Sequence, residues 1–259
     1  MMPNNLPFMV SYAQSGEDIL LRRALRHVQT GFYVDVGAQD PTLDSVTRHF
    51  YNNGWHGINV EPHPTYFAAL KRERTRDINI QAAIAASGTL ATFHFVDDSG
   101  LSSLNARSAE VAAKHHLKSH TGDVRLLKLV DVLEANAPRE IYFLKVDVEG
   151  SELDVLQSGD WDRHRPWIVV VEGTLPAEPT PCWELFEPFM LDARYKPVAF
   201  DGLNRWYVRE ESADLFDSFA CPVNVFDNYQ RWKEYEWDQW QARRRVAEPS
   251  TSFAAVFGR

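Results

Sequence analysis

The chain has 259 residues, of which 44% are hydrophobic and 24% are charged, and its formal net charge is -9. This length allows one large α/β domain or a domain with an appendage, and the composition is typical of globular proteins. The negative charge argues against a non-specific nucleic-acid binder, which normally carries a basic face.

The cysteines and the hydrophobic runs argue against further classes of protein. Only Cys182 and Cys221 occur, without the paired spacing of a zinc site or a disulfide framework, so we expect two buried free thiols. No hydrophobic run approaches the roughly 18 to 20 residues of a membrane span. The first ten residues lack the basic start and apolar core of a secretory signal. We therefore expect a cytoplasmic protein.

Residues 1–30 are expected to contain a helix. Apolar residues recur at helical spacing from Leu20 onward, and Ser15 with Asp18 resembles a capping box. Gln14, Glu17 and Asp18 have two interpretations that the sequence leaves open. They either begin this helix or belong to a lid that folds over a pocket.

The stretch Gly31–Asp40 is typical of the mouth of a nucleotide pocket. Its β-rich run ends at Gly37 and leads through a polar segment into a predicted helix at residues 45–50. Glycine lets the backbone approach a ligand closely, and a helix N-terminus offers free N–H groups to an anion. The pattern indicates a nucleoside-containing cofactor at the edge of a parallel sheet.

Two further segments fit such a cofactor. A predicted strand at residues 55–60 ends at Glu61, close to the spacing of about 20 residues at which an acid binds ribose hydroxyls in nucleotide-binding folds. The next predicted strand, residues 78–84, contains Ala82 and Ala83, whose small side chains would let an adenine ring lie close to the backbone. Residues 105–123, which are polar, are expected to form an exposed face or a mobile substrate loop.

Two later apolar runs end in carboxylates. Residues 141–146 lead to Asp147 and Glu149, and residues 167–171 lead to Glu172. The carboxyl ends of parallel strands meet at one edge of a sheet, so these acids should lie together. Such a concentration of like charge is costly unless protons, a cation or polar ligands occupy it.

The C-terminal third combines a predicted hairpin with an aromatic tail. Asp201 and Gly202 separate two apolar runs, which predicts an antiparallel pair at the end of the sheet. From Val225 onward aromatic residues alternate with charges, and this segment either packs onto the domain or forms a docking surface. We divide the chain into an N-terminal lid or helix, an enzyme domain and a tail with a loose end from Pro249, with the bounds 1–30, 31–222 and 223–259.

Missing motifs narrow the class of cofactor. A dinucleotide fingerprint needs three glycines at set positions, and the residues after Gly37 lack the later two. The chain also has no P-loop and no Gly-x-Ser-x-Gly elbow. S-adenosylmethionine fits better, because it needs a ribose-binding acid and an adenine pocket but no pyrophosphate site.

Five ordered blocks, residues 12–18, 31–47, 57–62, 143–152 and 200–205, form a pattern along the chain. With these blocks the sequence resembles the FkbM-type methyltransferases over most of its length, from about Tyr12 to about Phe226. Gln39 stands where the first motif of the family usually has asparagine. The resemblance implies an α/β class I methyltransferase (Rossmann-like) sheet, mostly parallel with a terminal antiparallel strand. It also implies transfer of a methyl group from S-adenosylmethionine to a hydroxyl. Relatives are often found with glycan-building enzymes, which implies that the hydroxyl belongs to a sugar in a glycan or polysaccharide.

The motifs and the resemblance together predict a site. The residues expected to bind the cofactor are Gln14, Asp35, Gly37, Ala38, Ser45, Thr47, Glu61, Ala82 and Ala83. Asp147 or Glu149 is the expected catalytic base, which accepts the proton of the attacking hydroxyl. The residues expected to orient the acceptor are Glu172, Asp201, Asn204 and Arg205.

Two alternatives remain open. In the first, Asp147, Glu149 and Glu172 bind Mg²⁺ together with the acceptor oxygen, since carboxylates are the ligands that this cation prefers. In the second, the chain is a non-catalytic methyltransferase-fold module that recruits enzymes of glycan synthesis. In either case the C-terminal tail is expected to bind a glycosyltransferase partner or to form a homo-oligomer.

Overall fold

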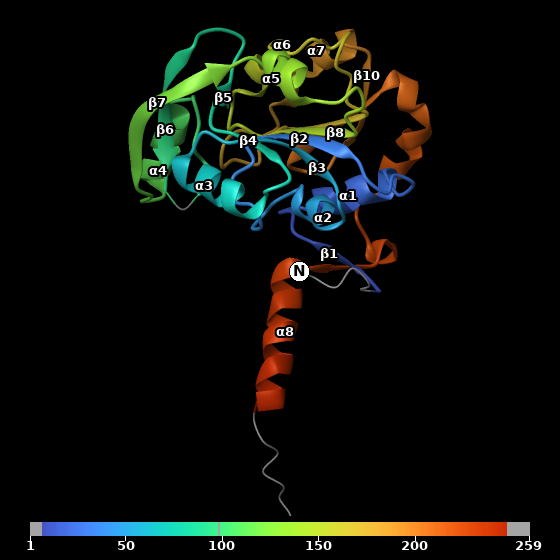
Figure 1. Cartoon of the computed structure of the whole chain (residues 1–259). Coiled ribbons are helices and arrows are strands. Elements are labelled where there is room, and N and C mark those ends of the chain that lie inside the picture. The colour runs from blue at the N-terminus through green and yellow to red at the C-terminus, as the bar shows by residue number, and fades with distance from the viewer. Residues whose placement is uncertain (1–6, 98, 248–259) are drawn as a thin grey trace, which may run out of the picture.

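A seven-stranded sheet forms the centre of the protein, in the order β10-β11-β9-β8-β2-β3-β4. The computed structural model describes residues 7–97 and 99–247 (Figure 1). Neighbouring strands from β4 to β9 are parallel, and β11 runs antiparallel to both β9 and β10. The expected α/β class, mostly parallel sheet and antiparallel pair at its end are confirmed. The strands are β2 (Phe32–Val36), β3 (His56–Val60), β4 (Ile78–Ile80), β8 (Phe143–Val146), β9 (Ile168–Glu172), β10 (Tyr195–Phe200) and β11 (Asn204–Arg209).

Helices cover both faces of this sheet, because its central strands are apolar on both sides. Val34 and Leu144 pack against α5 (Leu129–Asn136), α6 (Glu152–Gln157) and α7 (Glu187–Asp192). Tyr33 and Phe143, one position earlier in each strand, point to the other face. There they meet α1 (Glu17–Ala24), α2 (Arg48–Asn52) and the 3-10 helix η2 (Glu210–Phe219), and Figure 1 shows these layers above and below the sheet.

A second, three-stranded sheet lies beside the first, in the order β5-β7-β6. Residues 78–84, expected as one strand, are divided between β4 and β5. Residues 105–123, expected as an exposed face or mobile loop, contain α4 and the first part of β7, which pairs antiparallel with β6. Most of the described residues in this stretch are exposed, as the first alternative expected, but the loop was wrong because they form a helix and a strand whose backbone is paired. The elements here are α3 (Pro64–Glu73), β5 (Ala83–Ile84), β6 (Leu90–Val96), α4 (Arg107–Lys114) and β7 (Ser119–Leu127).

The two ends of the described chain meet. Strand β1 (Met9–Ser11) pairs in parallel with β12 (Tyr229–Arg231), and α8 (Trp232–Ala247) then projects from the body (Figure 1). The short 3-10 helices η1 (Trp183–Leu185) and η3 (Val225–Asp227) complete the described elements. The end that was expected to be loose, residues 249–259, lies outside the described residues.

The structure also bears on the cysteines and on the expectation that no segment spans a membrane. Both cysteines are free, but Cys221 is exposed and Cys182 only half-buried, so the expectation of buried thiols was wrong. Among the described helices, none combines the length and the apolar character needed to cross a membrane.

Candidate active site

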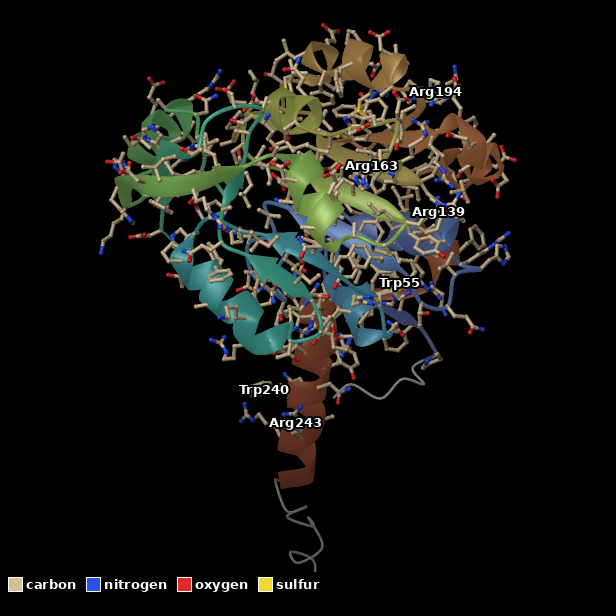
Figure 2. All side chains as sticks on the ribbon, turned by 45° about the horizontal axis from the view of Figure 1, so that its top comes forward. Trp55, Arg139, Arg163, Arg194, Trp240 and Arg243 are labelled. Atoms are coloured by element: carbon tan, nitrogen blue, oxygen red, sulfur yellow. The ribbon has the colours of Figure 1, made fainter. Side chains whose placement is uncertain are left out.

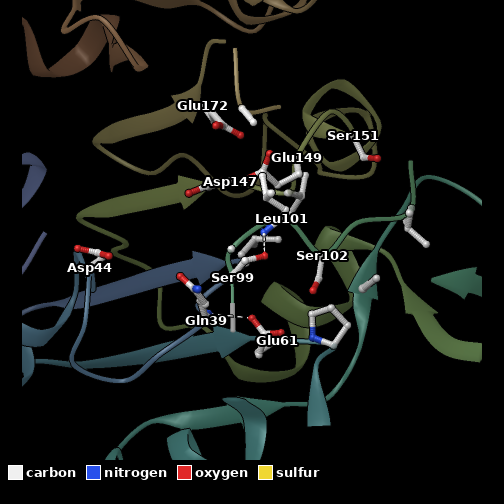
Figure 3. Close-up of a pocket in the computed structure, with 18 of the residues that line it drawn as sticks. Gln39, Asp44, Glu61, Ser99, Leu101, Ser102, Asp147, Glu149, Ser151 and Glu172 are labelled. Atoms are coloured by element: carbon white, nitrogen blue, oxygen red, sulfur yellow. Dashed lines mark hydrogen bonds between the residues drawn. The ribbon is translucent and has the colours of Figure 1, made fainter. Parts of the chain in front are cut away.

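A cavity of about 460 Å³ opens where β2, β3, β8 and β9 end (Figure 3). This edge of an open sheet is where α/β proteins bind their ligands. Several residues expected at the site line the cavity, namely Gln14, Gly37, Glu61, Ala82, Ala83, Asp147, Glu149 and Glu172. Asp35, Ala38, Ser45 and Thr47 do not line it. The first three are chain neighbours of the lining residues Val36, Gly37 and Asp44, and Thr47 is hydrogen-bonded to Asp35.

Gly37 joins the ends of β2 and β8. Its φ of +80° lies in the left-handed region, and a Cβ atom there would be 1.8 Å from the carbonyl oxygen of Asp147. The N–H groups of Gly37 and Ala38 donate to the carbonyl oxygen of Val60 at 3.0 and 3.2 Å. Only glycine therefore fits where the chain leaves β2 and passes the acid of β8.

A buried lysine holds the acids beneath the cavity together. Nζ of Lys145 lies 3.5 Å from Oδ1 of Asp35 and 3.3 Å from Oδ2 of Asp147. It also donates to the carbonyl oxygen of Gly37 at 2.8 Å. Burial raises the pKa of Asp35, while the charge of Lys145 opposes this shift. Burial alone would lower the pKa of Lys145, but Asp147 and Asp35 raise it, so the lysine stays charged.

Thr47 connects this group to a second buried cation. Its Oγ1 donates to Oδ2 of Asp35 at 3.3 Å and accepts a hydrogen bond from the guanidinium of Arg74. Arg74 is fully buried and pairs with Asp77 at 3.0 Å. Oγ of Ser45 lies 3.5 Å from Oγ1 of Thr47. The hydroxyls expected near the cofactor thus form a fixed network behind the cavity wall.

Glu61 is held at the tip of β3 by two backbone donors. Its Oε2 accepts from the N–H of Gln39 at 2.8 Å, and its Oε1 accepts from the N–H of His63 at 2.7 Å. Only 5% of the residue is exposed, and burial raises its pKa to about 7. Each carboxylate oxygen retains a lone pair, so this rigid acid can still accept hydrogen bonds from hydroxyls in the cavity.

Asp147, Glu149 and Glu172 form a carboxylate cluster on the other side of the cavity (Figure 3). One oxygen from each lies within 4.8 Å of the others. Oε2 of Glu149 and Oε2 of Glu172 are buried without a hydrogen-bond partner among the described residues. Burial and the charge of Asp147 raise the pKa of Glu149 to about 8 and that of Glu172 well above its ordinary value. The cluster can accept protons, bind hydroxyls or share one divalent cation.

The model of the methyltransferase FkbM domain matches residues 35–197, more than half of the chain. The chain belongs to the FkbM methyltransferase family. A search of curated proteins gave no match. The matched residues contain Glu61 and the whole carboxylate cluster, so both sides of the cavity belong to the FkbM domain.

The hairpin after the matched FkbM residues uses its polar side chains within the protein. Oδ1 of Asp201 accepts from the N–H of Asn204 at 2.6 Å, and its Oδ2 accepts from Nε1 of Trp206 at 2.8 Å. Nδ2 of Asn204 donates to Oε1 of Glu17 at 2.9 Å. Arg205 pairs with Glu187 at 2.7 Å. Asp201, Asn204 and Arg205 do not line the cavity, whereas their neighbours Gly202 and Leu203 do.

The buried carboxylate of Asp18 holds the segment before α1 to the start of that helix. Asp18 is fully buried and accepts from the hydroxyl of Ser11 and the N–H of Tyr12, both at 2.7 Å. The expected capping box of Ser15 and Asp18 was wrong, because Gly16 caps α1 and the carboxylate of Asp18 holds β1 instead. This arrangement brings Gln14 to the cavity.

Some residues at the site of this FkbM protein were not predicted. Lys145 was missed, although it lies two positions before Asp147 and a strand brings such residues to one side. The loop that contains Ser99, Leu101 and Ser102 also lines the cavity (Figure 3). The polar sequence of this loop does not show which part of the domain it covers.

Proposed function

We propose that this protein is an S-adenosylmethionine-dependent O-methyltransferase with a class I, Rossmann-like fold. The observation that carries the proposal is the pairing, in one cavity, of the backbone-held carboxylate of Glu61 with the cluster of Asp147, Glu149 and Glu172. The strand order and the antiparallel β11 support the class of fold. In this proposal residues 31–222 form the catalytic domain, residues 1–30 contribute a lid, and residues 223–259 form a tail.

The cofactor half of the cavity fits S-adenosylmethionine. Glu61 would accept hydrogen bonds from the ribose, and Ala82 and Ala83 would face the adenine. Ala82 is almost fully buried and Ala83 is 7% exposed, and both line the cavity, so the wall that they form is apolar. The residues that would hold the methionine end or shape its surroundings are Gln14, Asp35, Gly37, Ala38, Ser45 and Thr47.

The other half of the cavity, where the acceptor would bind, contains the carboxylates that would take the proton of the attacking hydroxyl. S-adenosylmethionine, when bound, supplies a sulfonium methyl group to the acceptor oxygen. Asp147 or Glu149 accepts the hydroxyl proton during attack, since a hydroxyl is a poor nucleophile unless a base takes its proton. Glu149 has its pKa raised to about 8, near neutrality, where a general base is most effective. Lys145 limits the repulsion between Asp35 and Asp147.

The acceptor that we propose is a sugar hydroxyl in a glycan or polysaccharide. Carboxylate and amide groups accept and donate the hydrogen bonds that sugar hydroxyls offer, and Glu172 provides such a group in the cavity. We also propose that Asp201, Asn204 and Arg205 contact the part of the acceptor that lies outside the cavity. The turn at Gly202 and Leu203, which lines the cavity, would bring the acceptor to them. A non-catalytic module that recruits glycosyltransferases is the alternative.

A divalent cation is the alternative means of activating the hydroxyl. The oxygens of Asp147, Glu149 and Glu172 lie close enough together to be shared by one Mg²⁺ ion. Transfer that is lost with EDTA and restored by Mg²⁺ would select this variant. Transfer that EDTA leaves unchanged would select the carboxylate base alone.

Two measurements on the full chain test the proposal. Calorimetry with S-adenosylhomocysteine should give saturable binding with one site, and absence of binding would reject the enzyme. Incubation of S-adenosylmethionine carrying a labelled methyl group with saccharide acceptors should give an alkali-stable methyl ether. Binding without transfer to any hydroxyl acceptor would favour the non-catalytic alternative.

A further inference from the structure

The helix α8 leaves the body of the protein after its first turn. Trp232 stacks on Tyr12 with ring centroids 6.0 Å apart, and Tyr235 packs edge-on against Phe8 at 6.2 Å. Beyond Tyr235, residues 236–244 are exposed apart from half-buried Gln241. Figures 1 and 2 show the helix projecting away from both sheets.

The projecting part of α8 carries a pair of exposed tryptophans. Trp237 is 57% exposed and Trp240 is 44% exposed, and their rings stack at 4.9 Å. The guanidinium of Arg244 lies 4.8 Å from the ring of Trp240. The part of α8 beyond Tyr235 lacks packing against the body, and an isolated helix shorter than about 12 to 15 residues is marginal in water. Tryptophan and arginine are also the residues that contribute most to protein interfaces, so this face is suited to a partner.

The charges of α8 are separated along its length. In the first half, Glu234, Glu236 and Asp238 outnumber one cation, Lys233, and in the second half lie Arg243 and Arg244. Two parallel copies would place like charges together, whereas two antiparallel copies place the acidic half of each against the basic half of the other. The charge pattern of the helix is therefore complementary to itself in the antiparallel direction.

The spacing of two charges makes this complementarity specific. Glu236 and Arg243 are seven residues apart, so they lie on one flank of the tryptophan face. In an antiparallel pair related by a two-fold axis, Glu236 of one copy faces Arg243 of the other, and the reverse contact forms at the same time. The axis then passes close to Trp240, whose ring meets its own copy.

We propose that α8 is a dimerisation arm, and that its partner is the α8 of a second copy of this chain in antiparallel orientation. The tryptophan pair supplies the apolar contact, and the reciprocal pairs of Glu236 and Arg243 set the direction. This inference does not depend on the proposed function, because none of its residues lines the cavity.

Sedimentation velocity on the full chain over a range of concentrations tests the proposal. The wild type should form a dimer, and the double variant Trp237→Ala/Trp240→Ala should raise the dimer Kd by roughly tenfold or more. Leu185→Ala is the matched control, since Leu185 is 70% exposed on η1, and it should leave the Kd unchanged. A wild type that stays monomeric, or a dimer that survives loss of both tryptophans, would overturn the proposal.

A charge exchange tests the antiparallel direction. Glu236→Arg alone and Arg243→Glu alone should each weaken the homodimer, because each leaves two facing pairs of like charge. The double variant Glu236→Arg/Arg243→Glu should restore the homodimer, and an equimolar mixture of the two single variants should form a heterodimer. Failure of both restorations would reject the antiparallel arrangement, provided that circular dichroism shows every variant folded.

Discussion

The carbonyl oxygen of Asp147 occupies the space that a side chain on Gly37 would need, 1.8 Å from the position of its Cβ. This contact joins the cofactor half of the cavity to the carboxylate cluster. The end of β2 and the end of β8 are therefore fixed relative to each other by backbone atoms, which cannot rearrange as a side chain can.

Gly37→Ala should destabilise the protein strongly. The substitution adds a clash with backbone to the strain of a φ of +80°, and we expect a loss of about 3 kcal/mol or more in the free energy of unfolding. Gly54→Ala is the control, since its φ is +90° but its nearest contact is at 3.7 Å, and it should lose only about 1–2 kcal/mol. Denaturant unfolding measures both. Equal losses would show that the contact with Asp147 is unimportant.

Lys145→Met should destabilise the fold because it leaves Asp35 buried without its cation. Removing one partner of a buried ion pair costs about 3–5 kcal/mol, and Asp35 is only 1% exposed. The double variant Asp35→Asn/Lys145→Met should recover part of this loss, since the charge that lacks a partner is then gone. If the double variant is less stable than Lys145→Met, the lysine does not act by neutralising Asp35.

The sequence predicts those residues of the cavity that lie at the ends of strands. Glu61, Asp147 and Glu172 follow apolar runs, and parallel strands bring their carboxyl ends to one edge, so local pattern alone brought these acids together. Lys145 could have been included on the same argument, because it lies two positions before Asp147 and side chains two positions apart along a strand point to the same face.

The roles of turn and tail residues could not be predicted in this way. Asp201, Asn204 and Arg205 form a polar motif, and the sequence does not show whether such side chains face a ligand or the protein. The contact of Asn204 with Glu17 at 2.9 Å joins residues that are distant in the chain. The projection of α8 likewise depends on where β1 and β12 meet, which no local pattern specifies.

The affinity for S-adenosylhomocysteine should fall as the pH falls below about 7. Burial raises the pKa of Glu61 to about 7, with Lys145 lowering it and Asp35 raising it, and the ionised form is the better acceptor for ribose hydroxyls. Binding should therefore be fully favourable above this pKa and weaken below it, by roughly tenfold between pH 8 and pH 6. Calorimetry at several pH values measures the effect. Glu61→Gln should bind more weakly and lose this pH dependence, and an unchanged profile in that variant would assign the titration to another group.

Asp147→Asn and Glu149→Gln separate proton transfer from cofactor binding. Glu61 and the carboxylate cluster lie on different sides of the cavity, so each substitution should leave the affinity for S-adenosylhomocysteine within about threefold. The substitution that removes the base should lower kcat by about 10²–10⁴, the usual contribution of general base catalysis. Single-turnover assays with a saccharide acceptor measure the chemical step directly. If both variants keep the wild-type rate, neither carboxylate is the base, and the proton must go to another group in the cavity such as Glu172.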